Sequence, residues 1–475
     1  LMILQPVPDT SSAVQIVDVE RGPILDRNGR LLAIATLVDS VAAWTPNVND
    51  PVTTAKTLSE VLEIDRTKLE DLLRNGTNFA FIKRKITPTQ SAQLRTQLEA
   101  GKLSGISLVP EYARTYPEQK LASHVLGFVG VDNLGLAGIE NTFNHVLSPA
   151  EIHADQQLVR GSQVVLTIDL NVQYAMEQIA LRARTEHRAD WVSILVLEAK
   201  TGDFLAYATS PRYDPNSFEK VLPSTRINRP VQTAYEPGSV FKIFSIASLL
   251  EQGAVHIDDT FLCEGAYTAR TPGGALIRIN DLRAHGTIST SDIIKYSCNA
   301  GAGFASDQID EKSFYDALSA FGFGIPVDLP FSGETSGIFH NVDRWSLRTK
   351  PTIAIGQEIA VSAVQIVRAA TAIANDGMMM RPQIVRRVAS ADGTIMKEFH
   401  PEPLRQVVSQ EVANTVLEMM EHATEIGGTA VLARVDGLRI SGKTGTAEIP
   451  DPSTGTYSED AVISSFLAIA PTDNP

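Results

Sequence analysis

The chain contains only two cysteines, Cys263 and Cys298. Two cysteines cannot build the disulfide framework of a small secreted scaffold or a four-cysteine zinc site. The nine histidines include no His-Glu-x-x-His motif and no closely spaced pair. The sequence therefore predicts no metal and no cofactor. Cysteine usage does not assign a compartment, because oxidising and reducing compartments both hold proteins this poor in cysteine.

Basic residues are in the minority, with 41 lysines and arginines against 55 aspartates and glutamates, a formal net charge of −14. This balance argues against a general nucleic-acid binder, which needs a basic face, and it gives no affinity for anionic membranes. The sequence also lacks any run of about 18 apolar residues, the length that a membrane-spanning helix requires. An apolar content of 43% is ordinary for a folded globular protein.

The pattern along the 475 residues changes near residue 160. Before it, residues 17–47 are β-rich, and 52–62 and 89–100 have helical patterns. After it, residues 192–197 and 204–208 predict a hairpin, and residues 461–470 predict a strand. Four further segments have helical patterns: 170–187, 239–252, 362–376 and 409–424. The sequence predicts an α+β protein of two domains, 1–160 and 161–475.

A serine followed three residues later by a lysine occurs at Ser217-Lys220 and at Ser239-Lys242. Chance gives about two such matches in a chain of this length, so the surroundings decide. Ser239 opens an apolar helical pattern, and positions i and i+3 share a helix face. A lysine in apolar surroundings can take a serine proton and create a nucleophile. The alternative, an N-cap serine and a surface lysine, is favoured for the Ser217 pair.

Ser297-Cys298-Asn299 is the second candidate motif, and it follows a helix-like run at 290–296. Its hydroxyl and amide could face one cleft, where the first relays a proton and the second binds a carbonyl. The small residues at 300–303 would let a substrate backbone come close. A turn at a helix end favours the same residues and remains the alternative.

Lys-Thr-Gly is the third candidate motif and also occurs twice. Lys200-Thr201-Gly202 falls at the turn of the predicted hairpin, where the glycine has a steric reason. Lys443-Thr444-Gly445-Thr446 lies among small residues, so this strand edge could pair with an extended peptide while Lys443 meets a carboxylate. A polar turn with a solvated lysine is the alternative.

Residues 437–444 also fit the phosphate-loop pattern Gly-x-x-x-x-Gly-Lys-Thr of nucleotide hydrolases. Such a loop needs a helix that begins at the Lys-Thr pair. Gly445, Pro450 and Pro452 follow instead, and residues 438–440 alternate as a strand does. The sequence therefore disfavours a nucleotide site.

The three motifs occur in an order that is typical of penicillin-binding proteins and class A β-lactamases. Further segments resemble class B penicillin-binding proteins, from about residue 21 to the end of the chain. In the N-terminal third they are residues 21–33, Arg114-Thr115-Tyr116-Pro117 followed by His124 and Gly127, and Gly138-Ile139-Glu140. In the remainder they are Tyr235-Glu236-Pro237-Gly238-Ser239 and Gly356-Gln357.

The resemblance implies an irregular N-terminal pedestal and a serine β-lactamase-like transpeptidase domain, an antiparallel sheet flanked by helices. It also implies a peptidoglycan D,D-transpeptidase. Its serine would attack the D-Ala-D-Ala carbonyl of a stem peptide and release the terminal D-alanine. The amine of a second stem peptide would resolve the acyl-enzyme into a cross-link, and β-lactam antibiotics would acylate the same serine.

Roles for individual residues follow from the resemblance. Ser239 would be the nucleophile and Lys242 its base. Ser297 would relay protons to the leaving amine, and Asn299 would orient the acyl amide of the substrate. Cys298, the variable middle residue of its motif, is expected to pack and not to react.

The resemblance assigns the strand motif to substrate binding. Lys443 and Thr444 would hold the carboxylate region of the substrate, with Gly445 and Thr446 beside them. The backbone N–H groups of Ser239 and Thr446 would form the oxyanion hole.

Two other functions compete with this one. A β-lactam hydrolase or penicillin-sensing receptor could share the fold, but Asn299 and Lys443 are 443 − 299 = 144 residues apart, longer than expected for a small lactamase. No Glu-x-x-x-Asn segment shortly after Ser297 supplies a deacylating carboxylate. A non-catalytic cell-wall scaffold is the other alternative.

The resemblance also implies a setting in the cell. Family members have an N-terminal anchor in the inner membrane, and their transpeptidase domain continues past the strand at 461–470. The chain is therefore expected to be an extracytoplasmic, periplasmic portion that is truncated at its C-terminus. Residues 356–377 resemble the division type more than the elongation type. Expected partners are a polymerase-type glycosyltransferase and division proteins.

Overall fold

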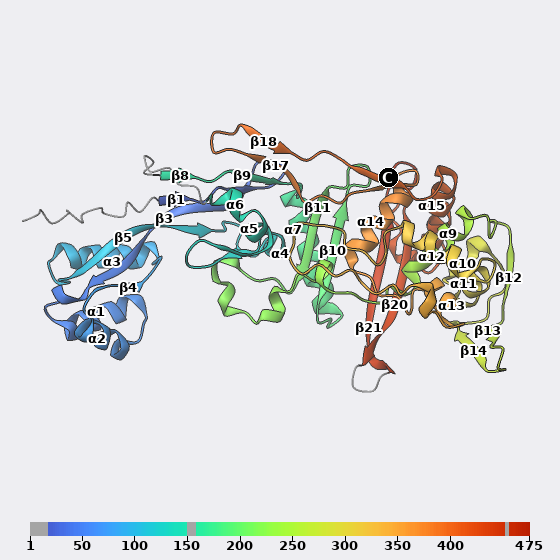
Figure 1. Ribbon diagram of the computed structural model, residues 1–475, viewed down its shortest axis with the longest axis horizontal. Helices are drawn as coiled ribbons and strands as arrows, with labels where there is room; N and C mark the ends of the chain where they lie inside the picture. The colour runs from blue at the N-terminus through green and yellow to red at the C-terminus, as the bar shows by residue number, and fades with distance from the viewer. Residues whose placement is uncertain (1–17, 150–157, 452–455) are drawn as a thin grey trace, which may run out of the picture. The chain divides into compact units, whose positions relative to one another are not determined.

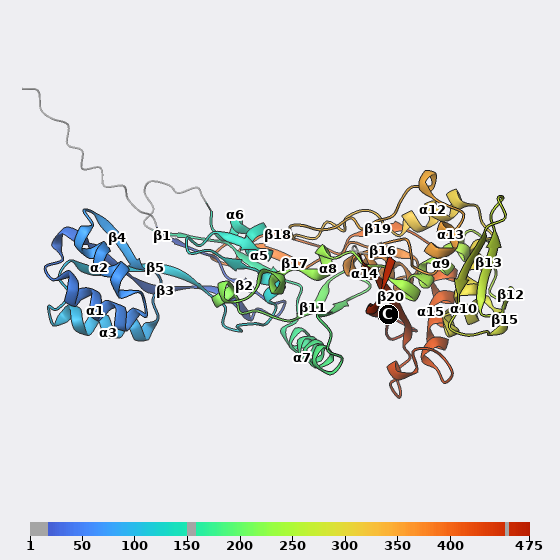
Figure 2. The same cartoon turned by 90° about the horizontal axis from the view of Figure 1, so that it is seen from below.

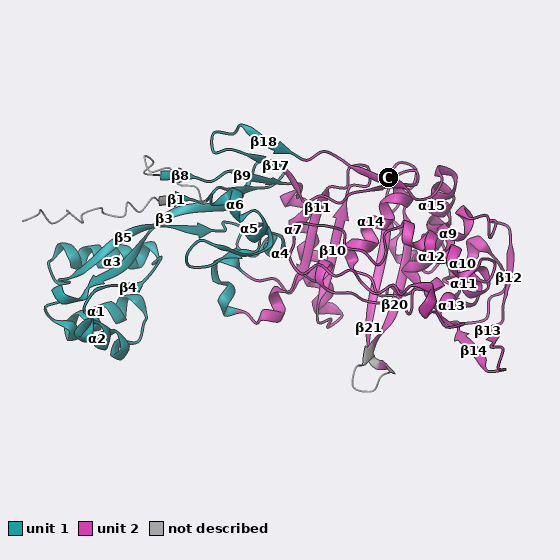
Figure 3. Ribbon diagram, in the orientation of Figure 1, with its two compact units in different colours: residues 1–166, 214–220, 387–398 teal, residues 167–213, 221–386, 399–475 magenta. Residues whose placement is uncertain are grey.

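The structure is a computed structural model that describes residues 18–149, 158–451 and 456–475. It divides into two compact units, shown in Figure 3. Unit 1 runs to Leu166 and includes two later segments, Asp214–Lys220 and Arg387–Glu398. Unit 2 holds the rest. The domain boundary expected at residue 160 stays a prediction, and residues 150–157 beside it lie outside the described ranges.

Unit 1 is built on a seven-stranded sheet in the order β18-β17-β9-β2-β3-β4, with β5 also paired to β3. The long β3 organises it, because β5 pairs along residues 34–43 and β4 along 41–44. These strands are β2 (Ile24–Leu25), β3 (Leu31–Trp44), β4 (Phe79–Lys83), β5 (Ile106–Thr115), β9 (Gln163–Leu166), β17 (Val385–Ala389) and β18 (Ile395–Glu398). Two further pairs are β1 (Asp18–Glu20) with β8 (Leu158–Arg160), and β6 (Phe128–Val129) with β7 (Gly135–Ala137).

Three capped helices of unit 1 lie beside β3, β4 and β5 (Figure 2). α1 (Pro51–Leu62) and α3 (Pro88–Glu99) confirm two predicted helices, and Asp50 and Thr87 cap them. Between them lies a third helix, α2 (Arg66–Asn75), which the sequence analysis did not predict. Its buried residues are Leu69 and Leu73, and with Leu72 they form an apolar stripe at the i, i+3, i+4 spacing of an amphipathic helix. The short helices are η1 (Thr45–Asn47), α4 (Ser123–Leu126), α5 (Gly138–Thr142), α6 (Asn144–Leu147) and η2 (Pro215–Lys220).

The three N-terminal sequence segments meet at one buried ion cluster. Arg21 Nε and Arg114 Nε each donate to a different carboxylate oxygen of Glu140, both at 2.6 Å. Tyr116 donates its hydroxyl to the same carboxylate at 3.2 Å. The three charged side chains are at most 1% exposed. The N-terminal segments that resemble the family therefore contain the charged residues that hold unit 1 together.

Replacing Glu140 with glutamine is expected to destabilise unit 1 by about 3–5 kcal/mol, since it leaves two buried guanidinium groups without their counter-charge. Burial already lowers the pKa of Arg21, against the effect of Glu140, so the charge depends on this partner. Native-state hydrogen exchange of the β3 and β5 amides measures the loss. The exposed Glu118→Gln is the matched control, expected within about 0.5 kcal/mol of the wild type. Equal protection in both variants would contradict the role of the cluster.

Unit 2 contains strands that pair two by two (Figure 1). The predicted hairpin is β10 (Val192–Leu197) with β11 (Phe204–Ser210), and the motif strand β20 (Ser441–Asp451) pairs with β21 (Thr456–Ile469). Both agree with the sequence. Lys443 lies within β20, where a phosphate loop would need the start of a helix. The prediction that residues 438–440 form a strand was wrong. A turn at Gly437 joins Val435 to Leu438 through an isolated β-bridge, and the strand starts only at Ser441. The other strands are β12 (Thr260–Cys263), β13 (Ala266–Arg270), β14 (Leu276–Asn280), β15 (Gly286–Ser289), β16 (Met378–Met380) and β19 (Pro403–Gln406).

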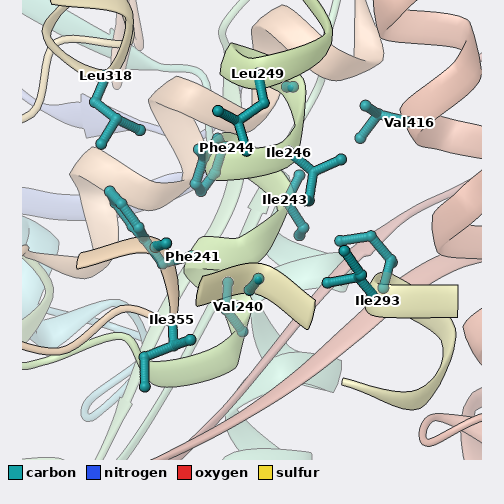
Figure 4. Packing of buried hydrophobic residues seen from close by; sticks show 14 of the residues in the cluster. Val240, Phe241, Ile243, Phe244, Ile246, Leu249, Ile293, Leu318, Ile355 and Val416 are labelled. Atoms are coloured by element: carbon teal, nitrogen blue, oxygen red, sulfur yellow. The ribbon is translucent and has the colours of Figure 1, made fainter. Parts of the chain in front are cut away.

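The core of unit 2 surrounds α9 (Lys242–Glu251), whose apolar side chains interdigitate with those of neighbouring helices in Figure 4. α7 (Leu170–Glu186), α14 (Ala363–Ala374) and α15 (Gln410–Thr424) confirm the other predicted helices. The remaining helices are η3 (Pro223–Arg226), α8 (Arg229–Gln232), η4 (Gly238–Phe241), α10 (Thr290–Tyr296), α11 (Asn299–Ser306), α12 (Glu311–Ala320), η5 (Val342–Arg344), α13 (Thr349–Ala354) and η6 (Val431–Ala433). Within the described ranges, no helix is both long enough and apolar enough to cross a membrane.

Candidate active site

Ser239 lies in the short 3-10 helix η4, which leads directly into α9. Gly238 has a φ of +54°, and a Cβ there would lie 2.5 Å from the carbonyl oxygen of Thr446 in β20. The glycine therefore allows the η4 turn to pack closely against β20. Pro237 is the N-cap residue of η4, so Ser239 is not the helix cap that the alternative interpretation required.

Lys242 is completely buried, and its ammonium group contacts both the first and the second motif. Nζ donates to Ser239 Oγ at 2.6 Å, to Asn299 Oδ1 at 2.6 Å and to the carbonyl oxygen of Ser297 at 3.1 Å. Burial lowers the pKa of Lys242 to about 8, although the charges of Asp281 and Cys298 act in the opposite direction. The surface-lysine interpretation is therefore wrong for this residue.

Ser297 joins the second motif to the third. It ends α10 in the left-handed conformation, with a φ of +60°, which is uncommon for a residue with a side chain. Its Oγ accepts a hydrogen bond from Lys443 Nζ at 2.7 Å. Lys443 is fully buried, and burial followed by the charge of Lys242 lowers its pKa well below the usual value. The structure thus brings Ser239, Lys242, Ser297, Asn299 and Lys443 into one network.

Gly445 and Thr446 bring β20 against the segment that precedes Ser239. A Cβ on Gly445 would lie 2.7 Å from the carbonyl oxygen of Pro237 and 2.6 Å from Ser465 Oγ. Only a residue without a side chain fits there. Thr444 is half-buried and Thr446 exposed.

The duplicate motifs lie elsewhere. Ser217 and Lys220 belong to η2 in unit 1, where the neighbouring Phe218 stacks on Phe128 with ring centroids 3.9 Å apart. Lys200 lies in the turn of the β10–β11 hairpin and donates to Asn474. Lys220 is exposed, as the sequence favoured, whereas Ser217 lies within η2 and is not the N-cap that was expected. Lys200 lies in the predicted turn.

Cys298 packs as the sequence predicts. Its side chain is completely buried, and its Sγ accepts the N–H of Gly301 at 3.1 Å at the start of α11. Burial, together with the neighbouring Asp281, raises the pKa of the thiol. A buried thiol of raised pKa is not a nucleophile.

The sequence analysis assigned no role to Asp281 or Glu236. Asp281 follows β14, its side chain is fully buried, and its Oδ2 accepts the N–H of Ala300 at 2.9 Å, which holds the start of α11. Glu236 accepts the Tyr457 hydroxyl at 3.0 Å next to the Ser239 turn. No spacing rule marks either residue, because hairpins that are distant in sequence bring their partners together.

A serine hydroxyl hydrogen-bonded to a buried lysine, beside a second serine–lysine pair and a strand edge of small residues, defines a serine acyl transferase. Comparison with known proteins identifies the family. The family described as "Penicillin binding protein transpeptidase domain" matches residues 192–475, which is more than half of the chain. The "Penicillin-binding Protein dimerisation domain" matches residues 16–165. The chain belongs to the penicillin-binding proteins and is a serine transpeptidase of that family.

Relatives agree over nearly the whole chain. Stage V sporulation protein D of Bacillus subtilis is 31% identical, over 96% of this chain and 73% of that protein. Peptidoglycan D,D-transpeptidase FtsI of Escherichia coli is 27% identical, over 98% of this chain and 79% of that protein. Penicillin binding protein 3 from Mycobacterium tuberculosis, solved with aztreonam, has a TM-score of 0.77 at 27% identity, covering 97% of this chain and 88% of the other. These likenesses confirm the predicted α+β fold of two domains.

Proposed function

We propose that this chain cross-links peptidoglycan stem peptides through an acyl-enzyme on Ser239, and that β-lactams inhibit it by acylating the same residue. The observation that carries the proposal is the 2.6 Å hydrogen bond between Ser239 Oγ and the buried Nζ of Lys242. A lysine of pKa about 8 is partly neutral at physiological pH and can accept the serine proton. Relatives named peptidoglycan D,D-transpeptidase support the substrate class.

Acylation then follows from the network. Ser239 Oγ attacks the carbonyl carbon between the two D-alanines while Lys242 takes its proton. The tetrahedral intermediate collapses, the C–N bond breaks, and the leaving amine of D-alanine receives a proton through Ser297 Oγ. Lys443, hydrogen-bonded to that hydroxyl at 2.7 Å, keeps it oriented. The amine of a second stem peptide attacks the resulting ester by the reverse path and regenerates Ser239.

Substrate binding is assigned to the edge of β20 and to Asn299. The backbone N–H groups of Ser239 and Thr446 form the oxyanion hole, which is supported by the close approach of Gly238 to Thr446. Thr444 and Gly445 meet the extended peptide, and Lys443 attracts its terminal carboxylate. Asn299 orients the acyl amide of the donor.

The cellular setting is part of the proposal. The chain acts outside the cytoplasm, with a membrane anchor at its N-terminal side and a pedestal to about residue 160, and its membership of the penicillin-binding proteins supports this part of the proposal. Names such as FtsI and Stage V sporulation protein D favour a division-type role, with a polymerase-type glycosyltransferase and division proteins as partners.

The purified chain is expected to join a donor peptide ending in D-Ala-D-Ala to an acceptor amine, with one D-alanine released per cross-link by the stoichiometry above. Mass spectrometry of the products and an amino-acid assay measure both. The Ser239→Ala chain is the matched control. Sustained hydrolysis of penicillin without any cross-linked peptide would instead identify a β-lactam hydrolase.

A further inference from the structure

Four side chains with metal-binding atoms gather next to the second motif of unit 2. Cys263 ends β12, Asp281 follows β14, His285 precedes β15, and Cys298 lies between α10 and α11. Both cysteines are free thiols. Their Sγ atoms and a carboxylate oxygen of Asp281 all lie within 4.8 Å of one another.

The distances in this cluster suit a single small cation. Asp281 Oδ2 lies 3.0 Å from Cys298 Sγ and 3.6 Å from Cys263 Sγ. Asp281 Oδ1 lies 3.9 Å from His285 Nε2. Tetrahedral zinc, with bonds of about 2.0–2.3 Å, holds its ligand atoms roughly 3.3–3.8 Å apart. The ligand atoms of Cys263, Asp281 and Cys298 approach this spacing, whereas the imidazole of His285 lies outside their 4.8 Å group and would have to move inward to complete the set.

The burial of Asp281 and His285 supports a bound cation. The side chains of Asp281 and His285 are 0% and 6% exposed. His285 Nε2 is a buried nitrogen without a hydrogen-bond partner in the described part of the chain, and it lies 3.9 Å from Asp281 Oδ1, beyond hydrogen-bond distance. Buried polar groups are nearly always paired, and thiols are weak donors for a carboxylate. A divalent cation would pair the imidazole and compensate the buried negative charge.

The surroundings resemble the outer shell of a metal site. The N–H of Ala300 donates to Asp281 Oδ2 at 2.9 Å, and the N–H of Gly301 donates to Cys298 Sγ at 3.1 Å. The ring of His285 stacks on Tyr296 with centroids 5.4 Å apart. Such contacts orient ligands and are a regular part of zinc sites.

We infer that Cys263, Asp281, His285 and Cys298 bind one structural Zn²⁺. Two sulfurs, one imidazole and one carboxylate favour zinc over magnesium or calcium, which prefer oxygen ligands. Because Cys298 lies between Ser297 and Asn299, the ion would hold both in place relative to β12 and β14. The site departs from the sequence expectation of no metal, since its ligands follow no familiar spacing. Zinc binding itself does not rest on the proposed function.

The chain purified from zinc-supplemented medium is expected to carry about one zinc per molecule, measured by plasma mass spectrometry. Replacement with Co²⁺ is expected to give the intense visible bands of a tetrahedral ion and the near-ultraviolet bands of cobalt–thiolate bonds. A wild-type chain that lacks stoichiometric zinc, or whose cobalt spectrum lacks thiolate bands, would overturn the inference. This result requires no variant to fold.

Variants locate the ligands. Cys263→Ser and His285→Gln are each expected to weaken zinc binding by at least the 10–100-fold that outer-shell changes cost. His256→Gln, an exposed histidine of the same unit, is the matched control and should bind as the wild type. Equal affinity in His285→Gln and His256→Gln would remove His285 from the site. Chelation should slow penicillin acylation and added Zn²⁺ should restore it, whereas an unchanged rate would overturn the role in holding Ser297 and Asn299.

Discussion

The Ser239→Ala chain is expected to form no covalent adduct with penicillin, and its rate of acylation should fall by about 10³-fold or more. The hydroxyl is the atom that forms the ester, and no other hydroxyl in the described ranges is hydrogen-bonded to Lys242. Mass spectrometry of the intact protein measures the adduct, and peptide mapping of the wild type is expected to place it on Ser239.

Ser217→Ala is the control for this experiment, because it removes the other serine that precedes a lysine by three residues. It should be acylated at the wild-type rate, since Ser217 lies in η2 of unit 1. An adduct that persists in Ser239→Ala would exclude Ser239 as the nucleophile. Normal labelling of the wild type together with its loss in Ser239→Ala would exclude the non-catalytic scaffold.

The candidate site was predictable because each motif is local. Ser239 and Lys242 are three residues apart, and in the 3-10 turn that the structure adopts, positions i and i+3 eclipse one another. The sequence predicted an α-helical start, where the same pair shares a face less directly. Helix ends were predictable for the same reason, as at Ser362, which caps α14, and at Gly377 after it.

Contacts between distant segments were not predictable. Arg21 and Glu140 are 119 residues apart, and neither of their sequence segments alone indicates that the two side chains form an ion pair. Asp281 lies 19 residues before Ala300, and the pairing of β13 with β14 delivers it there. The ligand spacing of His285 and Cys263 also becomes meaningful only after folding. Sequence spacing predicts which side chains come together within one turn of a helix or hairpin. Which side chains of distant segments come into contact depends on burial and on tertiary pairing.

Replacing Lys242 with methionine is expected to slow acylation of Ser239 by about 10²–10⁴-fold, the contribution of a positioned general base. Methionine keeps the unbranched shape of the side chain within the apolar core but cannot accept the proton. It also removes the donor to Asn299 Oδ1 and to the Ser297 carbonyl. Rates of labelling with a fluorescent penicillin, at saturation, measure the change.

Lys220→Met is the matched control, because it alters the exposed lysine of the other Ser-x-x-Lys pair and should leave the rate unchanged. Near-ultraviolet circular dichroism of Lys242→Met should show intact packing, which separates a lost base from a lost fold. If the variant is folded and still acylates at the wild-type rate, Lys242 is not the base. Lys443, the other buried lysine of the network, would then be the group that takes the proton through Ser297.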